Sequence, residues 1–280
     1  HKYRIVYSKI ESVNDINEIQ HPSVRETLKY FNCERGLEIH HDGDLPARSG
    51  LGSSSSFTVG LINAMNALNG AYSSQYELAN SAIHIEQNLI NECVGSQDQI
   101  SAAYGGFNQI EFYEDDTFSV EPKVFCQDKL KALNSHLMLF FTGISRFSSD
   151  VSESLVSNIK NCQSQMNDLY DMVSEGSSIL SSTNAPINDF GILMHQAWKT
   201  KKSLSDQVTN SSIDELYYAA LKAGATGGKV LGAGGGGFVL FFVKPENQSK
   251  VKAALSSLTF VPFKFDNSGS KVVLYQPNGF

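Results

Sequence analysis

Four consecutive serines follow two glycines at a point where a loop becomes a helix, and these residue types suit the binding of an anion. The stretch is LPARSGLGSSSSFTVGLINAMNAL, residues 45–68. The N-terminus of a helix exposes about four unpaired N–H groups and carries about half a unit of positive charge, so phosphate binds there readily. Gly50 and Gly52 allow backbone amides to approach a ligand closely. Hydroxyls that can bond phosphate oxygens or a magnesium ion come from Ser53, Ser54, Ser55 and Ser56.

Other interpretations of this loop are weaker. It is not a Walker A loop, because that motif needs a lysine after its last glycine and none follows Gly52. Ser53 could be only an N-cap and the glycines only a turn, but a cap needs one hydroxyl and a turn needs one glycine. Pro46 restricts the path of the chain into the loop. The pattern therefore favours phosphate binding over simple capping.

A second glycine-rich stretch, GATGGKVLGAGGGGFVLFF, covers residues 224–242. Gly232, Gly234 and Gly237 match G-x-G-x-x-G, but a dinucleotide-binding fingerprint must follow a strand and open a helix. Here the glycines run directly into FVLFFV, which has the composition of a strand. The stretch therefore predicts a loop whose backbone packs closely against another loop or a ligand. A flexible linker is the weaker alternative, because its flanks are apolar.

Two acidic residues, Glu86 and Asp98, stand twelve positions apart. Glu86 lies on a predicted helix, where an exposed acid is ordinary. Asp98 lies in the first turn of the next helix, where an acid compensates the helix dipole. Taken alone, each acid needs no further explanation. A kinase, however, needs both a metal ligand and a group that accepts the proton of the substrate hydroxyl.

The elements that must position these residues follow from periodicity and turn signals. Ser53–Leu68 has helical spacing, and capping boxes at Ser74/Glu77 and Ser96/Gln99 open two further helices. Predicted strands cover residues 1–10, 37–41, 107–113, 118–125, 136–143, 238–243, 259–265 and 271–275. Further helices are predicted over residues 147–182, 187–208 and 213–220, with a short one after Pro245. The mixed order without strict βαβ alternation predicts an α+β fold.

Composition excludes several classes of protein. The chain has 280 residues, and 22 basic against 29 acidic side chains give a formal net charge of −7, which argues against nucleic-acid binding. No apolar run reaches the roughly 20 residues that a membrane span needs. The four cysteines are scattered without zinc-site spacing, which is typical of reduced thiols in a cytoplasmic protein. A polar patch over residues 128–135 predicts a domain boundary.

Three segments resemble the motifs of one family, the GHMP kinases, named for galactokinase, homoserine kinase, mevalonate kinase and phosphomevalonate kinase. PARSGLGSSSS, residues 46–56, resembles the second motif of the family, P-x-x-x-G-L-G-S-S. GGKVLGAGGGGF, residues 227–238, resembles the glycine-rich third motif. VGSQDQISAAYGG, residues 94–106, is similar to the segment that carries the catalytic aspartate. The resemblance covers nearly the whole chain in order.

The resemblance implies a role for each matching residue. Pro46, Gly50, Leu51, Gly52 and Ser53 to Ser56 would bind the phosphates of ATP. Ser54 and Glu86 would hold Mg²⁺, and Asp98 would be the catalytic base or orienting group. Residues that would contact the substrate or support the phosphate loop are Arg48, Lys229, Gly232, Ala233, Gly234, Gly235 and Gly236. Lys199, Lys201 and Lys202 are better interpreted as an exposed helix face.

Within the family, the motifs and the segment HQAWKTKKSL resemble most the kinases that act on the anomeric hydroxyl of D-glycero-D-manno-heptose 7-phosphate. The expected function is therefore ATP-dependent phosphorylation of a sugar hydroxyl, with a sugar phosphate and ATP as partners and Mg²⁺ as cofactor. Alternatives are a fucose- or galactose-type kinase, or a non-catalytic protein that binds nucleotides or sugar phosphates. The resemblance leaves a homodimer open.

The family fold implies two domains. Residues 1–132 would form an N-terminal domain like the second domain of ribosomal protein S5, and residues 133–280 a ferredoxin-like C-terminal domain. The first motif of the family, P-x-R-[IV]-x-F-x-G-G-G-T-D, is absent before His1. The N-terminal domain is therefore expected to be incomplete at its start.

Overall fold

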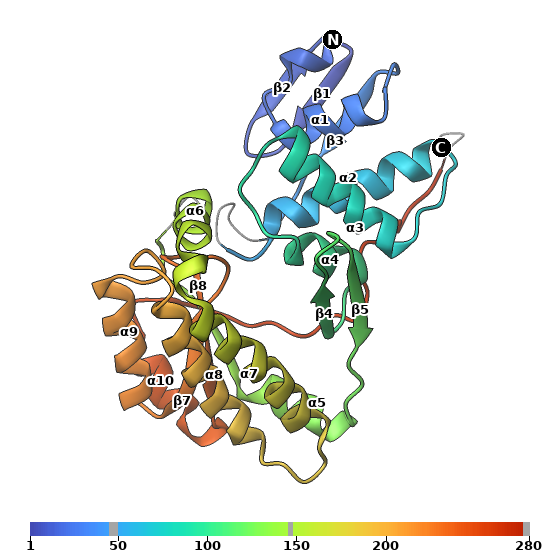
Figure 1. Ribbon diagram of the computed structural model, residues 1–280. Helices are drawn as coiled ribbons and strands as arrows, with labels where there is room; N and C mark the ends of the chain where they lie inside the picture. The colour runs from blue at the N-terminus through green and yellow to red at the C-terminus, as the bar shows by residue number, and fades with distance from the viewer. Residues whose placement is uncertain (45–49, 145–147, 277–280) are drawn as a thin grey trace. The chain divides into compact units, whose positions relative to one another are not determined.

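The computed structural model describes residues 1–44, 50–144 and 148–276. They form two compact units. Unit 1 comprises residues 1–47, 52–106 and 266–280, and unit 2 comprises residues 48–51 and 107–265. Each unit combines helices with a sheet, as Figure 1 shows, which confirms the predicted α+β class. Pro46 and Arg48 lie outside the described residues. The predicted domain boundary at residue 132 stays a prediction.

Unit 1 contains a three-stranded sheet in the order β2-β1-β3. Its strands are β1 (Tyr3–Val6), β2 (Ile10–Val13) and β3 (Leu37–His40). β1 pairs antiparallel with β2 and parallel with β3, and α1 lies between β2 and β3 in the chain. The helices are α1 (Pro22–Tyr30), α2 (Ser53–Leu68), α3 (Gln75–His84) and α4 (Gln97–Tyr104), with 3₁₀ turn η1 (Ile16–Glu18) and π-helical turn η2 (Ile85–Leu89).

The core of unit 1 joins this sheet to two helices. Tyr3 and Ile5 point from β1 into it, because residues two apart on a strand face the same side. Val24 and Leu28 of α1 are four residues apart and therefore share one helix face. Side chains of α2 complete the cluster. This packing fixes the direction of α2, whose first residues carry the predicted phosphate site.

Unit 2 contains two sheets. β4 (Asn108–Phe112) and β5 (Phe118–Pro122) form an antiparallel pair, as predicted. A four-stranded antiparallel sheet in the order β7-β8-β6-β9 is built from β6 (Leu137–Phe141), β7 (Ala225–Val230), β8 (Phe238–Val243) and β9 (Thr259–Val261). In chain order this is second-third-first-fourth. With helices between its first two and its last two strands, it is the ferredoxin-like arrangement that was expected.

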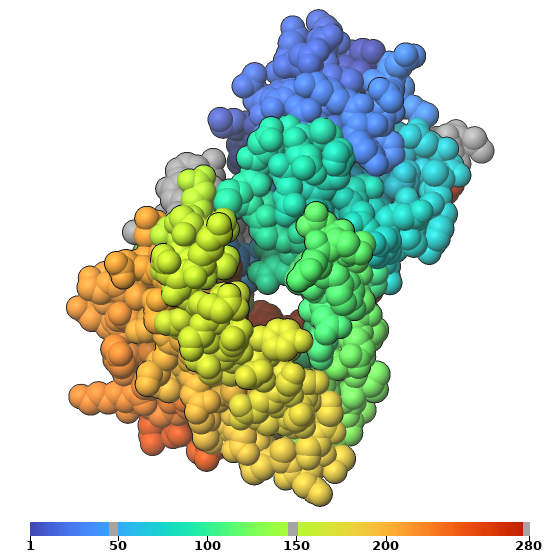
Figure 2. Space-filling view, viewed as in Figure 1, coloured from blue at the N-terminus to red at the C-terminus, as the bar shows by residue number. Residues whose placement is uncertain are grey.

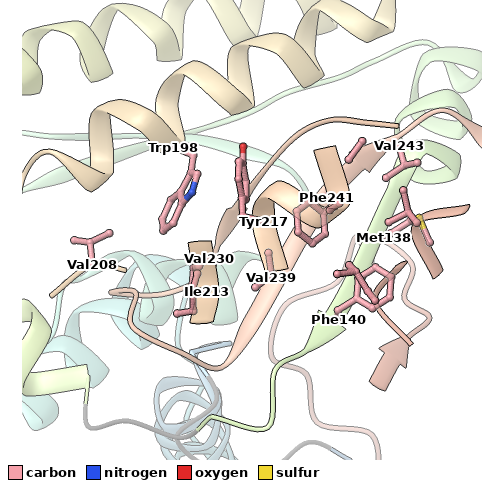
Figure 3. Close-up of a cluster of buried hydrophobic side chains, with 14 of the residues drawn as sticks. Met138, Phe140, Trp198, Val208, Ile213, Tyr217, Val230, Val239, Phe241 and Val243 are labelled. Carbon is pink, nitrogen blue, oxygen red and sulfur yellow. The ribbon is translucent and has the colours of Figure 1, made fainter. Parts of the chain in front are cut away.

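Helices make up the rest of unit 2. They are α5 (Gln127–His136), α6 (Ser148–Asn158), α7 (Gln163–Ser181), α8 (Ile187–Lys202), α9 (Ser211–Lys222) and α10 (Gln248–Ala254), with 3₁₀ turns η3 (Ile159–Asn161) and η4 (Pro245–Asn247). Residues from α6 to α9, yellow-green to orange, form much of the face of unit 2 in Figure 2. Figure 3 shows the core beneath, where Trp198 of α8 and Tyr217 of α9 lie beside Phe241 of β8.

Several predicted element limits are wrong, each for a local reason. The strand predicted over residues 1–10 ends at Val6 and a second strand begins at Ile10, because the Tyr7 N–H donates to the Lys9 carbonyl and turns the chain. The strand predicted over 259–265 ends at Val261, since Pro262 cannot donate to a ladder. The helical region 147–182 is interrupted at Cys162, and the polar patch 128–135 is part of α5.

Other differences concern elements that were misplaced or missed. The helix predicted to reach Val208 ends at Lys202. Residues 271–275 form no strand within the described part of the chain, and Val273 is 85% exposed. β7 was hidden by its glycines, which weaken the strand signal although they pack closely here. α1 was not predicted, because the helix has only nine residues and most of them are polar.

Candidate active site

The N-cap residue of α2 is a glycine, so none of the four serines that follow it caps the helix. Gly52 is the N-cap residue, with φ of 66° and ψ of 24°, and its carbonyl accepts the Ser56 N–H at 2.8 Å. A glycine has no side chain with which to cap the helix. The alternative that Ser53 serves only as an N-cap is therefore wrong. Among the described residues no side chain caps the start of α2, which leaves its first amides suited to an anion.

The four serine side chains face different surroundings. Ser55 is buried at 5% exposure, while Ser54 and Ser56 are exposed and Ser53 is half-buried. The distribution follows from the helix, because successive residues turn by about 100° around its axis. One hydroxyl therefore points into unit 1, and the others remain accessible.

The buried hydroxyl meets Glu86. The carboxylate of Glu86 is 1% exposed and accepts a hydrogen bond from Ser55 Oγ at 2.9 Å and from Thr58 Oγ1 at 2.8 Å. Gln99 Nε2 donates to the same carboxylate, and Gln99 is fully buried. Glu86 is therefore not an exposed acid on a helix face. Its spacing from Ala79 and Ala82, which are also buried, was the signal for this in the sequence.

A π-helical turn carries Glu86. The Ile90 N–H donates to the Ile85 carbonyl at 2.9 Å, five residues back, directly after α3 ends. Such turns are frequent at functional sites. Glu92 follows the turn, and burial together with the nearby charge of Glu86 raises the pKa of Glu92. The local charge is thus negative and without a described basic partner in an ion pair, which favours a cation at this place.

Asp98 lies against the start of α2. A Cβ atom placed on Gly52 would stand 3.1 Å from Asp98 Cγ and 3.3 Å from Asp98 Oδ2. A glycine is thus required at position 52 for two reasons, the positive φ and the close approach to Asp98. Asp98 occupies the first turn of α4 and is half-buried, and burial raises its pKa. Asp98, the predicted catalytic acid, and Gly52, a residue of the predicted phosphate loop, are neighbours within unit 1.

The capping box predicted at Ser96 is wrong because both of its side chains are used elsewhere. Ser96 Oγ accepts a hydrogen bond from Gln87 Nε2 at 3.1 Å. Gln99 turns inward to Glu86 instead of back to the N-cap. By contrast, the box predicted at Ser74 forms, with Ser74 Oγ accepting from the Glu77 N–H.

The second glycine-rich stretch is the turn between β7 and β8 in unit 2. Its place between two strands confirms that it is not a dinucleotide-binding fingerprint. A Cβ on Gly232 would stand 3.0 Å from Gly50 Cα, and a Cβ on Gly50 would stand 3.1 Å from the Leu231 carbonyl oxygen. Both glycines have positive φ, of 66° and 77°. The structure therefore brings the Gly-rich loop against the first part of the phosphate loop.

One lysine of α8 contacts this loop. Lys201 Nζ donates to the Gly232 carbonyl at 2.6 Å, and Lys201 is half-buried. The interpretation of Lys199, Lys201 and Lys202 as one exposed face is wrong for Lys202, which is half-buried and pairs with Asp214, and it is wrong for Lys201. Its position three residues after Trp198, a core residue, was the available signal. Lys229, predicted from its place beside the loop, lies on β7.

The sequence thus located Glu86, Asp98 and both glycine-rich loops, and it missed Thr58, Gln99 and Lys201. The proposed roles of the individual residues stay predictions. Ala233, Gly234, Gly235 and Gly236 lie in the β7–β8 turn, and Leu51 follows Gly50 in the phosphate loop. Ser54 is exposed, and the serine hydroxyl that contacts Glu86 belongs to Ser55.

A magnesium ion fits the chemistry of these residues. Mg²⁺ prefers oxygen ligands and is usually held by one or two carboxylates together with substrate phosphates. Glu86 supplies a carboxylate, and Ser55, whose hydroxyl bonds that carboxylate, is flanked in α2 by Ser54 and Ser56. The described residues hold no cluster of three or more His, Cys, Asp or Glu side chains that could bind a metal alone. The ion would therefore depend on ligand oxygens.

The fold is α+β, and the start of α2 is suited to binding a phosphate group. Within the part of the chain that the structure describes, no helix is long and apolar enough to cross a bilayer. Two family models match the chain: the GHMP kinases N-terminal domain over residues 19–106, and the GHMP kinases C-terminal domain over residues 184–259. The chain belongs to the GHMP kinase family.

Curated relatives agree with this family. D-glycero-alpha-D-manno-heptose 7-phosphate kinase of Campylobacter jejuni is 32% identical over 243 residues, which cover 84% of this chain and 70% of that protein. L-fucokinase/L-fucose-1-P guanylyltransferase of Bacteroides fragilis is 29% identical, but the chain spans only 25% of its length. Mevalonate kinase of Thermococcus sibiricus is 25% identical and is covered over 70% of its length.

Solved structures of the same family superpose on this chain. A D-glycero-D-manno-heptose 1-phosphate kinase from Bacteroides thetaiotaomicron gives a TM-score of 0.74 at 23% identity, with 95% of this chain and 81% of that chain covered. A sugar kinase from Campylobacter jejuni gives a TM-score of 0.67 at 26% identity, with the same coverage. The fold is that of the GHMP kinases.

Proposed function

We propose that this chain phosphorylates the anomeric hydroxyl of D-glycero-D-manno-heptose 7-phosphate with ATP. The reaction class, ATP-dependent transfer of a phosphoryl group to a sugar, goes with the family and its sugar-kinase relatives. The identity of the sugar is the part of the proposal that goes further than the family. The observation that carries it is the 32% identity to the heptose 7-phosphate kinase over 84% of this chain.

The proposed reaction is a direct transfer. The anomeric oxygen of the sugar attacks the γ-phosphorus of ATP, the bond between that phosphorus and the β,γ-bridging oxygen breaks, and ADP leaves. The hydroxyl proton passes to the carboxylate of Asp98. Such transfers depend mainly on positioning and on neutralising charge. Asp98 suits the role because it lies beside Gly52, at the positive end of α2.

The proposed phosphate site is the loop from Gly50 to Ser56. The first amides of α2, with the accessible hydroxyls of Ser54 and Ser56, would donate to the phosphate oxygens of ATP. Gly232 packs against Gly50 and supports its backbone. Pro46 and Arg48 are proposed members of the same loop on sequence grounds.

Mg²⁺ is the proposed cofactor, and it would neutralise phosphate charge when bound. Glu86 would hold it through the carboxylate and Ser54 through the hydroxyl. Ser55, Thr58 and Gln99 keep the Glu86 carboxylate in place through their hydrogen bonds. The proposed location is the cytoplasm, where ATP is supplied and where the four free thiols would stay reduced.

The test is a coupled assay of ADP release with the full-length protein and a panel of sugars. The panel contains D-glycero-D-manno-heptose 7-phosphate, the unphosphorylated heptose, L-fucose and D-galactose. We expect kcat/KM to be highest for the heptose 7-phosphate, and NMR to place the new phosphate at the anomeric carbon. Preferred turnover of fucose or galactose would overturn the substrate. ATP binding without turnover of any sugar would make the protein a binding module.

A further inference from the structure

The turn between β7 and β8 must be held by contacts to its backbone. Residues 232–237 contain five glycines and one alanine, so the turn has almost no side chains to pack. Gly232, Gly234, Gly235 and Gly237 all have positive φ, a conformation that costs a glycine backbone entropy to keep. A loop of this kind stays ordered only where neighbouring groups hold it.

Several described groups hold the backbone of the loop inside unit 2, among them Asn210, which donates to the Gly235 carbonyl, and Thr142, which donates to the Gly237 carbonyl. The Gly235 N–H donates to the Val208 carbonyl at 2.8 Å. The Gly237 N–H donates to the Ile144 carbonyl at 2.7 Å. Both of these contacts lie in the second half of the loop. The first half is held by Lys201 Nζ, which donates to the Gly232 carbonyl at 2.6 Å.

Lys201 differs from the other lysines of its helix. Like Lys202, it is half-buried and lies within about one helix turn of Trp198, but its ammonium group bonds a loop carbonyl. Lys202 instead pairs with Asp214 of α9 at 2.9 Å, and Lys199 is exposed. Burial and the charge of Lys229 lower the pKa of Lys201 to about 8. The fold thus keeps an ammonium group at an unfavourable place, where it bonds a loop carbonyl.

The carbonyl that Lys201 bonds belongs to Gly232, the residue that packs against Gly50 of the phosphate loop. A Cβ on Gly232 would crowd the backbone of Gly50, and a Cβ on Gly50 would crowd the carbonyl oxygen of Leu231, the residue before Gly232. A shift of Gly232 would therefore move Gly50 or open a gap beside it. Lys201, Gly232 and Gly50 form one chain of contacts that leads from α8 to the phosphate loop.

We infer that Lys201 is a positioning residue, which holds the Gly232 carbonyl so that the β7–β8 turn supports Gly50 in its phosphate-binding conformation. The inference rests on the proposed function for its effect on ATP, but the contact itself can be tested without it. Hydrogen bonds from charged donors are stronger than neutral ones, which suits the side chain that holds the first half of the loop.

The first test is amide hydrogen exchange in the full-length protein, without ligand. The variants are Lys201→Met, Lys201→Arg, which keeps a charged donor, and Lys202→Met as the matched control. In Lys201→Met we expect the peptide spanning residues 231–238 to exchange about tenfold faster, with Lys201→Arg close to wild type. Unchanged exchange of this peptide in Lys201→Met, or an equal change in Lys202→Met, would overturn the inference.

The second test is kinetic and separates positioning from general destabilisation. We expect Lys201→Met to raise KM for ATP about tenfold, with kcat changed less than about threefold, since loop support acts on binding. Lys201→Arg should restore KM, and Lys202→Met should leave it unchanged. A wild-type KM in Lys201→Met would overturn the role. If the wild type turns over no sugar, the proposed function fails, but hydrogen exchange still decides whether Lys201 holds the loop.

Discussion

At the scale of single residues, the site depends on where glycine permits close approach. Gly52 allows Asp98 to lie against the start of α2, and Gly50 allows the phosphate loop to lie against Gly232. Both were visible in the sequence as residues of a motif. Their partners in space were not, because no local pattern says which distant backbone a glycine meets.

Asp98→Asn tests the proposed base. General-base catalysis is worth about 10²–10⁴-fold, so kcat should fall by that order while KM for ATP changes little. Steady-state kinetics with ATP and sugar varied in turn measure both quantities. A kcat equal to that of wild type would remove Asp98 from the role.

The activity of the wild type should also show an acid limb set by Asp98. Burial raises the pKa of Asp98, so its carboxylate takes up a proton at a higher pH than an ordinary aspartate. Since the base must be ionised, activity falls as the pH drops through this raised pKa. A profile of kcat/KM against pH measures the limb, and a limb at the ordinary pKa of aspartate, about 3.9, would contradict the prediction.

Two neighbouring serines should give different phenotypes. Ser54→Ala should raise the Mg²⁺ concentration needed for half-maximal activity, because Ser54 is the proposed metal hydroxyl. Ser55→Ala removes one of the donors to the buried Glu86 carboxylate and should cost about 1–3 kcal/mol of stability. Metal titrations and thermal unfolding of both variants measure the two effects. The opposite pattern would make Ser55 the metal-binding serine.

The sequence predicted the serine cluster but not this division of roles. Ser54 and Ser55 are chemically identical and adjacent, and only the rotation of α2 relative to the packed η2 decides which one is buried. Gln99 was predicted as a capping residue for the same reason. Its side chain can satisfy a helix end or a buried carboxylate, and the tertiary partner prevailed.

At the scale of elements, glycine contacts join α8 to β7. A Cβ on Gly227 of β7 would stand 2.1 Å from the Gly191 carbonyl oxygen of α8. A Cβ on Gly191 would stand 2.5 Å from Phe242 Cδ1 of β8. The helix therefore lies on the sheet at backbone distance, and it is this close packing that gives Lys201 its reach to Gly232.

Gly227→Ala should therefore destabilise the protein by about 3 kcal/mol, because overpacked cores must shift backbone. Gly60→Ala is the matched control, since a Cβ on Gly60 would meet nothing within 4 Å. Within α2, that change should be neutral or stabilising by up to about 1 kcal/mol. Denaturant unfolding measures both variants. A Gly227→Ala protein as stable as wild type would mean that α8 can move off β7 freely.

Elements with strong periodicity or a complete motif were predictable, and elements that depend on a partner were not. The limits of α2 and the antiparallel pairing of β4 with β5 followed from local sequence. β7 could not be predicted, because two central glycines look like a loop until a helix is seen packed on them. The segment 271–275 has strand composition, but a strand exists only where another strand pairs with it.

At the scale of the whole molecule, charge is the property that the sequence sets directly. The formal net charge of −7 and a pI near 5.5 mean that phosphorylated substrates meet a protein of the same sign. The proposed site would then rely on local groups, which are the amides at the start of α2 and the proposed Mg²⁺.

The chain should be least soluble near its pI. Net charge keeps proteins apart in solution, and its loss promotes association. Light scattering across pH 4.5 to 8 should therefore show most aggregation near pH 5.5. Scattering that rises steadily toward alkaline pH would show that charge does not govern association here.

The π-helical turn at Ile85–Leu89 places the Glu86 carboxylate by counting residues. Each residue added to α3 or deleted from it would rotate the next part of the helix by about 100° and move it 1.5 Å along the axis. The acid would then swing away from Ser55 and Thr58, even if every side chain around it stayed the same. The number of residues from Ser74 to Glu86 thus fixes where the Glu86 carboxylate lies. We expect substitutions within this segment to disturb the carboxylate less than an insertion or a deletion.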